Sequence, residues 1–281
     1  MLSPLNSKPD NNGSIANVRL GAVSYLNSRP LVHQLAENLP ASKVTLDYPS
    51  RLADALARRE LEVALIPSIE YFRGSNYEIL SNACVAARGP VMSVKLFCRV
   101  HPGQIRTVAL DEGSRTSATL TRIVLAEKYG VSPKTEPLSL LSSTQHSEAD
   151  AVLLIGDRAM HHPDESFVEV MDLGEIWNEW TGLPFVFAMW VAQKDADTTG
   201  VADVLERTRD LGVRHLHDIA TTEAPGLNLT VPVAEDYLRN NLYYTMTSAE
   251  RAGLNLFHQL ALEHQLVNRH DSPVFTDLVT A

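Results

Sequence analysis

The sequence has little of what marks several large classes of protein. Only two of its 281 residues are cysteines, Cys84 and Cys98, which is too few for a disulfide framework, and we expect both to be small core residues. The longest apolar run, residues 183–192, is too short to span a bilayer. The net charge of −10 at pH 7 argues against nucleic acid as a partner. A small anionic ligand stays compatible with this charge, because local donors and dipoles govern a binding site more than total charge does.

Cysteine and histidine spacings predict no metal site. The candidate clusters lie in polar loops or on helix surfaces, where exposed, solvated side chains are expected: His161-His162 with Asp164, and His215 with His217. The first seventeen residues are polar and rich in turn-forming residues, and they contain no apolar core of the signal-peptide kind. We therefore expect a disordered tail over residues 1–17, a cytoplasmic protein and no metal ion.

Apolar runs alternate with helical patterns after this tail, which predicts an α/β fold with a mostly parallel sheet. The expected strands cover residues 18–23, 61–68, 91–100, 108–113, 149–157 and 185–193. Ser50 is expected to cap the helix that continues as RLADALARRE. From Thr198 onward the pattern is helical, with a capping box formed by Thr247 and Glu250.

The run from residue 108 to residue 130 joins a short strand directly to a helix start rich in hydroxyl groups. This start consists of Ser114, Arg115, Thr116 and Ser117. Backbone N–H groups there have no partner inside the helix and carry partial positive charge, so the position suits an anion. An inward Arg115 adds a bidentate pair with that anion, whereas the alternatives leave it in solvent or paired with Asp111 or Glu112. Gly130 stands where a left-handed residue ends a helix.

Four expected strands end in small polar groups. These ends are Ser24-Tyr25-Leu26-Asn27-Ser28, Pro67-Ser68, Ser114 to Ser117, and Gly156-Asp157. In open parallel sheets, ligands bind outside the carboxyl ends of the strands, so the set predicts a pocket for a small, oxygen-rich molecule. Each residue taken singly is better explained as a helix cap than as a ligand contact. The same loop type at every strand end favours a binding site.

The number of strands and the long helical tail predict two lobes rather than one sheet. Residues 18–97 and 192–281 form the expected first lobe, and residues 98–191 are inserted as the second. The crossings are expected near residues 93–97 and 189–191. This is the two-lobed plan of type II periplasmic-binding-protein-like folds, which close on ligand by a hinge.

The expected ligand site is the cleft between these lobes. On the first lobe it is lined by Ser24–Ser28 and Ser68, and on the second by Ser114–Ser117 and Asp157. Thr181 and Gly182 form a small loop just before a crossing strand, where the backbone can approach a ligand closely.

Seven segments, in this order, resemble the chorismate dehydratases, which act first in the futalosine route to menaquinone. The segments are GAVSYLNSRPL, DYPSRLADAL, EVALIPSIEY, GPVMSVKLF, DEGSRTSATLTRIVL, ADAVLLIGDRAM and DLGEIWNEWTGLPFVFAMWVA. The resemblance runs from Val18 to Ala192, and the tail from Thr198 matches in type more than in motif. It implies a two-lobed fold with the substrate in the interlobe cleft. It also implies that chorismate loses water to give 3-[(1-carboxyvinyl)oxy]benzoate, with no metal and no organic cofactor.

The resemblance further implies roles for particular residues. Asn27 and Ser93 match the family's LN and GPVMS positions, and they are expected to fix the enolpyruvyl arm and the departing hydroxyl. The loop Ser114–Ser117 is expected to hold one of the two substrate carboxylates, with Arg88 as a second candidate for the other.

No conventional base is evident among these positions. Asp157 and Glu70 are the only carboxylates at the expected strand ends, and His33 is expected to face away from the cleft. We therefore hypothesise that the enolpyruvyl carboxylate of the substrate itself takes the ring proton. Two other functions fit the same pocket. One is a non-catalytic binding protein or sensor for a small aromatic carboxylate, and the other is the related dihydroxynaphthoate synthase, which the lack of a cleft histidine disfavours.

Overall fold

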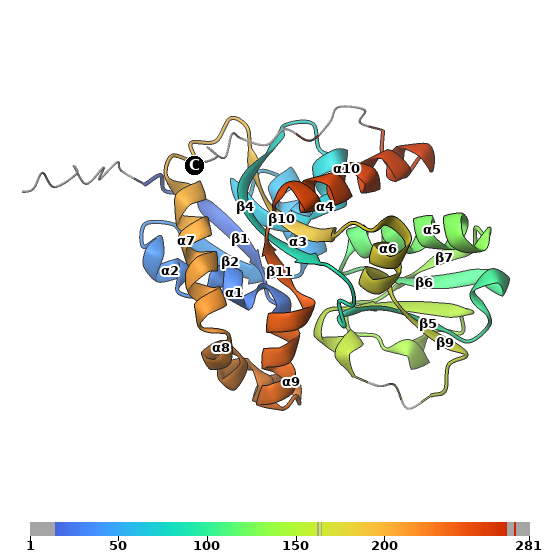
Figure 1. Cartoon of the computed structure of the whole chain (residues 1–281). Helices are drawn as coiled ribbons and strands as arrows, with labels where there is room; N and C mark the ends of the chain where they lie inside the picture. Colours follow the sequence, from blue (N-terminus) through green and yellow to red (C-terminus); the bar gives the residue numbers. More distant parts are fainter. Residues whose placement is uncertain (1–14, 162, 164, 269–272, 274–281) are drawn as a thin grey trace, which may run out of the picture.

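Two β-sheets carry the fold (Figure 1). The computed structural model describes residues 15–161, 163, 165–268 and 273. The first sheet contains, in spatial order, β11 (Tyr243–Thr245), β4 (Tyr77–Ala87), β10 (Phe185–Gln193), β3 (Val63–Pro67), β1 (Arg19–Val23) and β2 (Lys43–Asp47). The second contains β7 (Lys134–Leu138), β6 (Thr107–Asp111), β8 (Ala151–Ile155), β5 (Val94–Cys98) and β9 (Glu169–Asp172).

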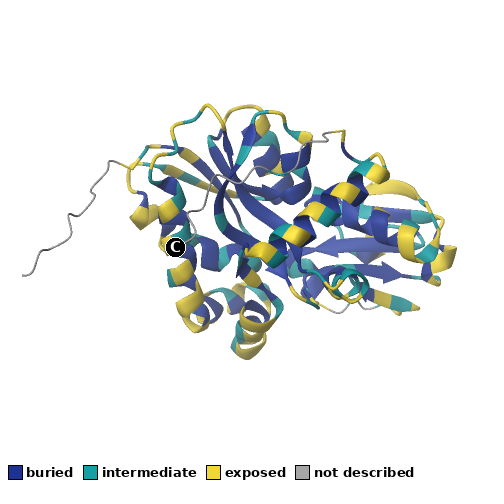
Figure 2. Cartoon of the chain, turned by 45° about the horizontal axis from the view of Figure 1, so that its top comes forward, coloured by how far each residue is buried: buried dark blue, intermediate teal, exposed yellow. Residues whose placement is uncertain are grey.

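Helices connect these strands and cover the sheets. In the first lobe they are α1 (Arg29–Val32), α2 (Leu35–Asn38), α3 (Pro49–Ala57), α4 (Ser68–Arg73), α7 (Val201–Arg214), α8 (Leu216–Glu223) and α9 (Val231–Asp236). In the second lobe they are α5 (Arg115–Tyr129) and α6 (Leu173–Thr181), and α10 (Ser248–Glu263) lies over both lobes. The central strands and the inward helix faces are buried, while the outer helix faces and the edge strands β2 and β7 are largely exposed (Figure 2).

Both sheets are mixed, so the expectation of a mostly parallel sheet is wrong. β1 pairs in parallel with β2 and β3, but β10 runs antiparallel to β3 and β4. In the second sheet β6 is parallel to β7 and β8, whereas β5 is antiparallel to β8 and β9. β5 and β10, the strands that follow the two crossings, run opposite to both of their neighbours, and β11 is also antiparallel to β4.

The crossings lie a few residues from their expected positions. All of β5 pairs within the second sheet, so the first crossing is residues 88–93 and not 93–97. All of β10 pairs with β3 and β4 in the first sheet, so the second crossing is residues 182–184 and not 189–191. An apolar run has no feature that marks which sheet it joins, because pairing is decided by partners far along the chain.

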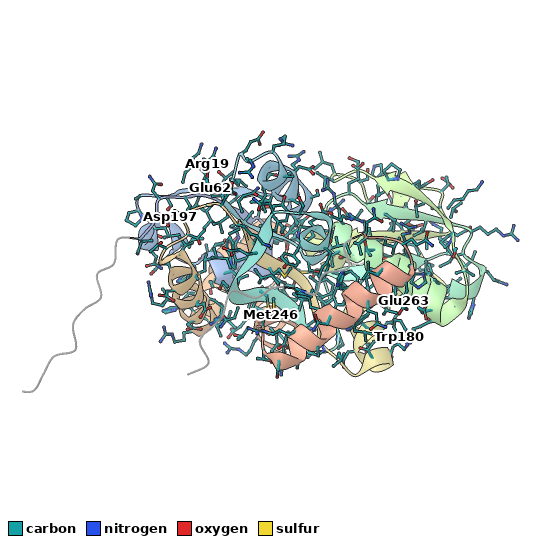
Figure 3. The ribbon with its side chains drawn as sticks, turned by 90° about the horizontal axis from the view of Figure 1, so that it is seen from above. Arg19, Glu62, Trp180, Asp197, Met246 and Glu263 are labelled. Atoms are coloured by element: carbon teal, nitrogen blue, oxygen red, sulfur yellow. The ribbon has the colours of Figure 1, made fainter. Side chains whose placement is uncertain are left out.

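Helix α10 forms a third connection between the lobes. Seen from above, it runs from beside Met246 to Glu263 along the molecule (Figure 3). It packs on β10 and α4 of the first lobe and on α5 of the second. Its Gly253 faces Pro184 of the second crossing so closely that a Cβ atom there would lie 1.9 Å from the Pro184 carbonyl oxygen. At its end, His264 Nε2 lies 2.7 Å from Glu127 Oε1 of α5.

Several smaller expectations are settled by the local structure. Cys84 and Cys98 are buried free thiols, and the Thr247–Glu250 capping box is present, as expected. Ser50 is not a helix cap, because α3 begins at Pro49 with Tyr48 as the capping residue. None of the helices in the described part of the chain is long and apolar enough to cross a membrane.

The expected N-terminal tail can be judged only at its end. Residues 1–14 lie outside the described residues. Of residues 15–17, Ala16 donates a backbone hydrogen bond of 2.9 Å to the Thr199 carbonyl, so this end is attached to the loop before α7.

Candidate functional site

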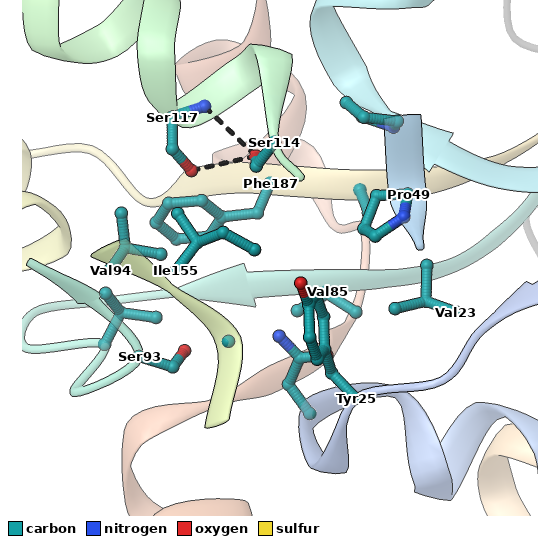
Figure 4. Close-up of a pocket in the computed structure, with 15 residues that line it drawn as sticks. Val23, Tyr25, Pro49, Val85, Ser93, Val94, Ser114, Ser117, Ile155 and Phe187 are labelled. Atoms are coloured by element: carbon teal, nitrogen blue, oxygen red, sulfur yellow. Dashed lines mark hydrogen bonds between the residues drawn. The ribbon is translucent and has the colours of Figure 1, made fainter. Parts of the chain in front are cut away.

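A pocket lies between the lobes, where strands of both sheets end (Figure 4). It contains about 470 Å³ of space that no atom fills, part of which is open to solvent. The first lobe contributes Val23, Tyr25, Asn27, Pro49, Pro67, Val85, Phe187 and Ala188. The first crossing and the second lobe contribute Val91, Ser93, Val94, Ser114, Ser117, Ile155 and Gly156. The four strand ends named from the sequence therefore meet at one pocket.

The hydroxyl loop before α5 supplies one polar side of this pocket. Ser114 is the capping residue of α5, and its Oγ accepts a hydrogen bond from the Ser117 backbone N–H at 3.3 Å. The two serine oxygens lie 3.0 Å apart (Figure 4). The pocket thus faces the positive end of a fifteen-residue helix, which favours a bound anion.

Arg115 and Thr116 point away from the pocket, so the expected inward Arg115 is wrong. The Arg115 guanidinium lies 2.8 Å from Asp54 of α3 and 3.0 Å from Glu70 of α4. Neither partner is one of the neighbouring acidic residues considered from the sequence. Thr116 Oγ1 accepts a hydrogen bond from the Ile69 N–H at 3.2 Å and holds α4 against α5. Successive helix positions face different sides, so Ser114 and Ser117 share the pocket side and the two residues between them do not.

Three other predicted serines do not line the pocket. Ser28 Oγ donates to the carbonyls of Val23 and Tyr25 at 2.6 and 2.9 Å, which shapes the turn after β1. Ser68 Oγ donates to the Val186 carbonyl at 2.7 Å and joins α4 to β10. Ser24 donates its backbone N–H to Asp47 at the end of β2. These contacts position the pocket loops without facing a ligand.

Of four further predicted positions, one lines the pocket and three do not. Gly156 lines the pocket, whereas Asp157 Oδ1 accepts a hydrogen bond from the Leu26 N–H at 3.1 Å and so connects the two lobes. Thr181 and Gly182 end α6: the Thr181 hydroxyl donates to the Trp177 carbonyl at 2.8 Å, and Gly182 adopts a left-handed φ of 69°. Neither of these two lines the pocket.

Arg88 is also engaged elsewhere. Its guanidinium forms a bidentate pair with the fully buried Glu250 of α10, at 2.8 and 3.2 Å, and covers the ring of Tyr243. Its expected role toward a second carboxylate is therefore wrong, because both oxygens of a buried carboxylate already occupy it.

Tyr25 lines the pocket, within the expected segment Ser24–Ser28, although no separate role was predicted for its hydroxyl. Its ring packs on Gly156, where a Cβ atom would lie 2.7 Å from a ring carbon, and its hydroxyl lies beside Gly113. The hydroxyl is buried and has no hydrogen-bond partner among the described residues. Burial, with a contribution from the charge of Asp111, raises the Tyr25 pKa far above its usual value, so the phenol stays neutral. The position of Tyr25 in the SYLNS segment, two residues before Asn27, is the feature of the sequence that could have indicated a role in the pocket.

Asn27 and Ser93 meet at the pocket from different segments of the chain. Asn27 lies in the short helical turn η1 (Leu26–Ser28) after β1, and Ser93 ends the first crossing. Asn27 Oδ1 and Ser93 Oγ are buried and lack hydrogen-bond partners within the described structure. An unsatisfied buried polar atom costs about 1–3 kcal/mol, and such atoms concentrate where function requires them.

Asp111 fixes the two second-lobe loops that reach the pocket. Its carboxylate accepts hydrogen bonds from the N–H groups of Gly113 at 2.8 Å and Ile155 at 3.1 Å, and it pairs with Arg158. Burial raises the pKa of Asp111 to about 6, and Arg158 opposes that rise. The loops after β6 and β8 are thereby held in one relative position.

No acidic or histidine side chain lines the described pocket wall. Glu70 is occupied by Arg73 and Arg115, and His33 stacks on His215 with ring centroids 5.3 Å apart. Burial raises the pKa of Asp157 to about 6, but its carboxylate lies behind the pocket, on the Leu26 N–H.

The histidine clusters weighed as metal sites in the sequence are only partly within the described residues. His217 lies 2.8 Å from Glu235, and His162 and Asp164 lie outside the described residues. Across the described ranges, no group of three or more His, Cys, Asp or Glu side chains is placed to hold a metal ion.

Proteins of known structure share this two-lobed fold. A protein from Archaeoglobus fulgidus matches with a TM-score of 0.68 at 15% identity, over 89% of this chain and 98% of that one. The periplasmic aliphatic sulphonate binding protein of Escherichia coli matches with a TM-score of 0.59 at 17% identity, over 94% and 95%. At these identities the likeness shows the fold alone, and it confirms the expected type of fold.

Sequence comparison gives a closer relationship. A chorismate dehydratase from Thermus thermophilus is 32% identical over 260 residues, which cover 85% of this chain and 93% of that enzyme. A chorismate dehydratase from Campylobacter jejuni is 25% identical over 245 residues, which cover 84% and 94%. Residues 18–263 match the family model described as menaquinone biosynthesis, and the chain therefore belongs to the menaquinone biosynthesis family.

Proposed function

We propose that this protein is a chorismate dehydratase, which eliminates water from chorismate to give 3-[(1-carboxyvinyl)oxy]benzoate. The two relatives bearing that name, each matched over most of its length, support the substrate and the reaction. The observation that carries the proposal is the pocket wall itself. It offers unpartnered oxygens on Tyr25, Asn27 and Ser93 and a helix start with two hydroxyls, but no carboxylate or imidazole base. We place the reaction in the futalosine route and in the cytoplasm.

The pocket suits a small dicarboxylate with a ring. One carboxylate binds the N–H groups and hydroxyls at the start of α5, through Ser114 and Ser117. Hydrogen bonds to a charged group contribute about 1.5–3 kcal/mol each. Apolar side chains, among them Val85, Ile155 and Phe187, form the surface on which the ring lies.

The reaction needs orientation and charge stabilisation more than a strong base. The ring proton beside the ether oxygen leaves, the neighbouring hydroxyl departs as water, and the ring becomes aromatic. The ring proton is conjugated with the ring carboxylate, so negative charge develops on that carboxylate, where neutral donors such as the Tyr25 phenol and the serine hydroxyls stabilise it. The enolpyruvyl carboxylate, folded over the ring, takes the proton and passes it to the departing hydroxide, which leaves as water. Asn27 and Ser93 hold the arm and the leaving hydroxyl.

Substitution separates this mechanism from one with a protein base. Asn27→Ala and Ser93→Ala each lower kcat for chorismate dehydration about 100-fold or more, as expected for the loss of a preorganised transition-state contact. Glu70→Gln keeps its turnover, because Glu70 pairs with arginines outside the pocket. Full turnover by both pocket variants, with loss of turnover in Glu70→Gln or Asp157→Asn, contradicts the substrate-carboxylate mechanism.

A binding protein for an aromatic carboxylate is the second candidate function. The fold shared with a sulphonate-binding protein and the absence of a base from the described pocket wall favour it. Turnover distinguishes the two functions. A receptor binds chorismate stoichiometrically and releases it unchanged, whereas the dehydratase releases a product lighter by one water.

A further inference from the structure

The C-terminal helical segment places a buried tyrosine directly behind Asn27 and Ser93. Tyr237 begins η6 (Tyr237–Asn241), a π-helical turn that follows α9, and its side chain is fully buried. Such turns are rare and occur frequently at functional sites. The turn is attached to the first crossing, since Asn241 Nδ2 donates a 2.8 Å hydrogen bond to the Pro90 carbonyl, three residues before Ser93. Tyr237 therefore approaches the pocket from an element that contributes no pocket-lining residue within the described chain.

The Tyr237 hydroxyl lies close enough to the side chains of Ser93 and Asn27 for both to lower its pKa through hydrogen bonding. By strict geometry neither contact is an aligned hydrogen bond, because Tyr237 Oη, Ser93 Oγ and Asn27 Oδ1 all lack partners among the described residues. Three buried oxygens from three separate segments thus converge with their hydrogen-bonding capacity unused. Catalytic hydrogen bonds are often long or poorly aligned without substrate and tighten in the substrate complex.

We propose that Tyr237 is a positioning residue for the dehydration, whose hydroxyl bridges Asn27 and Ser93 and fixes them relative to each other when chorismate is bound. This inference rests on the proposed function. A phenol suits the task, because one oxygen donates one hydrogen bond and accepts another. Burial raises the Tyr237 pKa well above its usual range, although the contacts with Ser93 and Asn27 oppose that rise, so the group stays a neutral donor. Asn27 and Ser93 belong to different segments, and a displacement near 1 Å between catalytic groups can lower a rate about 100-fold.

Tyr244 provides a matched control. It lies on β11, its hydroxyl is also buried without a partner among the described residues, and it does not line the pocket. Tyr237→Phe and Tyr244→Phe therefore each remove one buried phenolic oxygen and leave the ring in place. A purely structural contribution of the hydroxyl affects the two variants alike.

The test is steady-state kinetics with chorismate, together with urea unfolding midpoints, for the wild type, both tyrosine variants and the combinations with Asn27→Ala and Ser93→Ala. We expect Tyr237→Phe to lower kcat about 10- to 100-fold with KM changed less than threefold, and Tyr244→Phe to stay within twofold of wild type. In the Asn27→Ala or Ser93→Ala background, Tyr237→Phe then lowers kcat by less than twofold further, because the residue it positions is absent.

Four results overturn the inference, and they differ from one another. A wild-type kcat in Tyr237→Phe contradicts the inference about Tyr237 and leaves the proposed function intact. Equal losses in both tyrosine variants, or losses that multiply fully with Asn27→Ala and Ser93→Ala, assign the hydroxyl a structural role only. Failure of the wild-type protein to convert chorismate contradicts the proposed function, and the inference falls with it.

Discussion

Gly156 illustrates how a single residue shapes the pocket. Its φ of 65° lies in the left-handed region, and a Cβ atom would lie 2.7–2.8 Å from three carbons of the Tyr25 ring. Both the backbone conformation and the contact therefore require glycine. The ring that crosses from one lobe to the other can reach its place only over a residue without a side chain.

Substitution of Gly156 is predicted to cost more than backbone strain alone. Gly156→Ala lowers the free energy of unfolding by about 2–3 kcal/mol and weakens chorismate binding, because Tyr25 must move. Gly130→Ala is the control: its φ is 68°, but no atom lies within 4 Å of the added Cβ, so we expect a loss near 1 kcal/mol. Urea unfolding measures both. Equal losses at the two positions would show that the Tyr25 contact imposes no constraint.

The raised pKa of Asp157 predicts a pH-dependent stability. The carboxyl titrates near 6 in the folded protein and near 3.8 in the unfolded chain, so the folded state binds the proton more tightly between these values. The stabilisation that the protonated Asp157 carboxyl provides is therefore complete below about pH 4 and is lost as the pH rises to about 6. The difference between wild type and Asp157→Asn, measured by urea unfolding, falls by at most about 3 kcal/mol across this window. A difference that stays level or increases contradicts the raised pKa.

The sequence predicts which types of residue occur near the pocket better than it predicts which way their side chains point. The hydroxyl loop was identified, but Arg115 was expected inside because its partners, Asp54 and Glu70, come from helices about 45 to 60 residues earlier. No role was predicted for the hydroxyl of Tyr25, within the segment Ser24–Ser28, or for that of Tyr237, because the residue type alone does not show whether a hydroxyl lacks a partner. What identifies these two is an unpartnered hydroxyl, which only the tertiary structure reveals.

Among the elements, α10 depends on a buried charge at its first turn. Glu250 completes the capping box with Thr247, and its carboxylate pairs with Arg88 beside the first crossing. Hydrogen bonds with Arg88 and Thr247 hold the Glu250 pKa below its usual value although burial opposes this. The helix start, the end of β4 and the first crossing are thus joined by one carboxylate.

Removal of that carboxylate is predicted to destabilise the whole chain. Glu250→Ala lowers the free energy of unfolding by about 2–4 kcal/mol, since it removes the cap and leaves Arg88 without its partner. Glu263→Ala, at the exposed far end of the same helix, changes it by less than about 0.5 kcal/mol. Thermal or urea unfolding of the two variants compares them directly. A loss below about 1 kcal/mol in Glu250→Ala would mean that the buried pair contributes little.

Strands were predictable from the sequence where a short apolar run is bounded by turn-forming residues. β1, β3, β5, β8 and β10 all lie within expected strands, and β6 begins one residue before its expected strand. β2, with a mostly exposed pattern, and the long β4 gave no clear signal, and strand direction did not follow from the alternation of helices and strands. Direction and sheet membership depend on pairing between distant segments, as in β10, which pairs with β3 and β4 more than 90 residues earlier.

For the molecule as a whole, three connections define the relation between the lobes. Two are the crossings at residues 88–93 and 182–184, and the third is α10. Asp157 adds a contact across the cleft through the Leu26 N–H. The pocket forms where these connections bring the strand ends together, so residues far apart in the sequence, such as Asn27 and Ser93, become neighbours.

The chain as a whole is negatively charged, whereas the pocket presents hydrogen-bond donors to the proposed anionic substrate. The chain carries a net charge of −10, yet the proposed substrate is a dicarboxylate. The α5 start with its hydroxyls, and the neutral phenols kept protonated by burial, provide donors in a pocket without its own carboxylates among the described residues. The fold type and family were accessible from ordered sequence segments, whereas this local balance of donors required the assembled lobes.

The most direct test of the central claim is incubation of the purified, metal-free protein with chorismate, followed by mass spectrometry and ultraviolet absorbance of the products. We predict a product lighter by one water that retains the three-carbon arm and shows new aromatic absorbance, formed with many turnovers per protein. Release of pyruvate, or stoichiometric binding of chorismate that is recovered unchanged, would contradict the assignment.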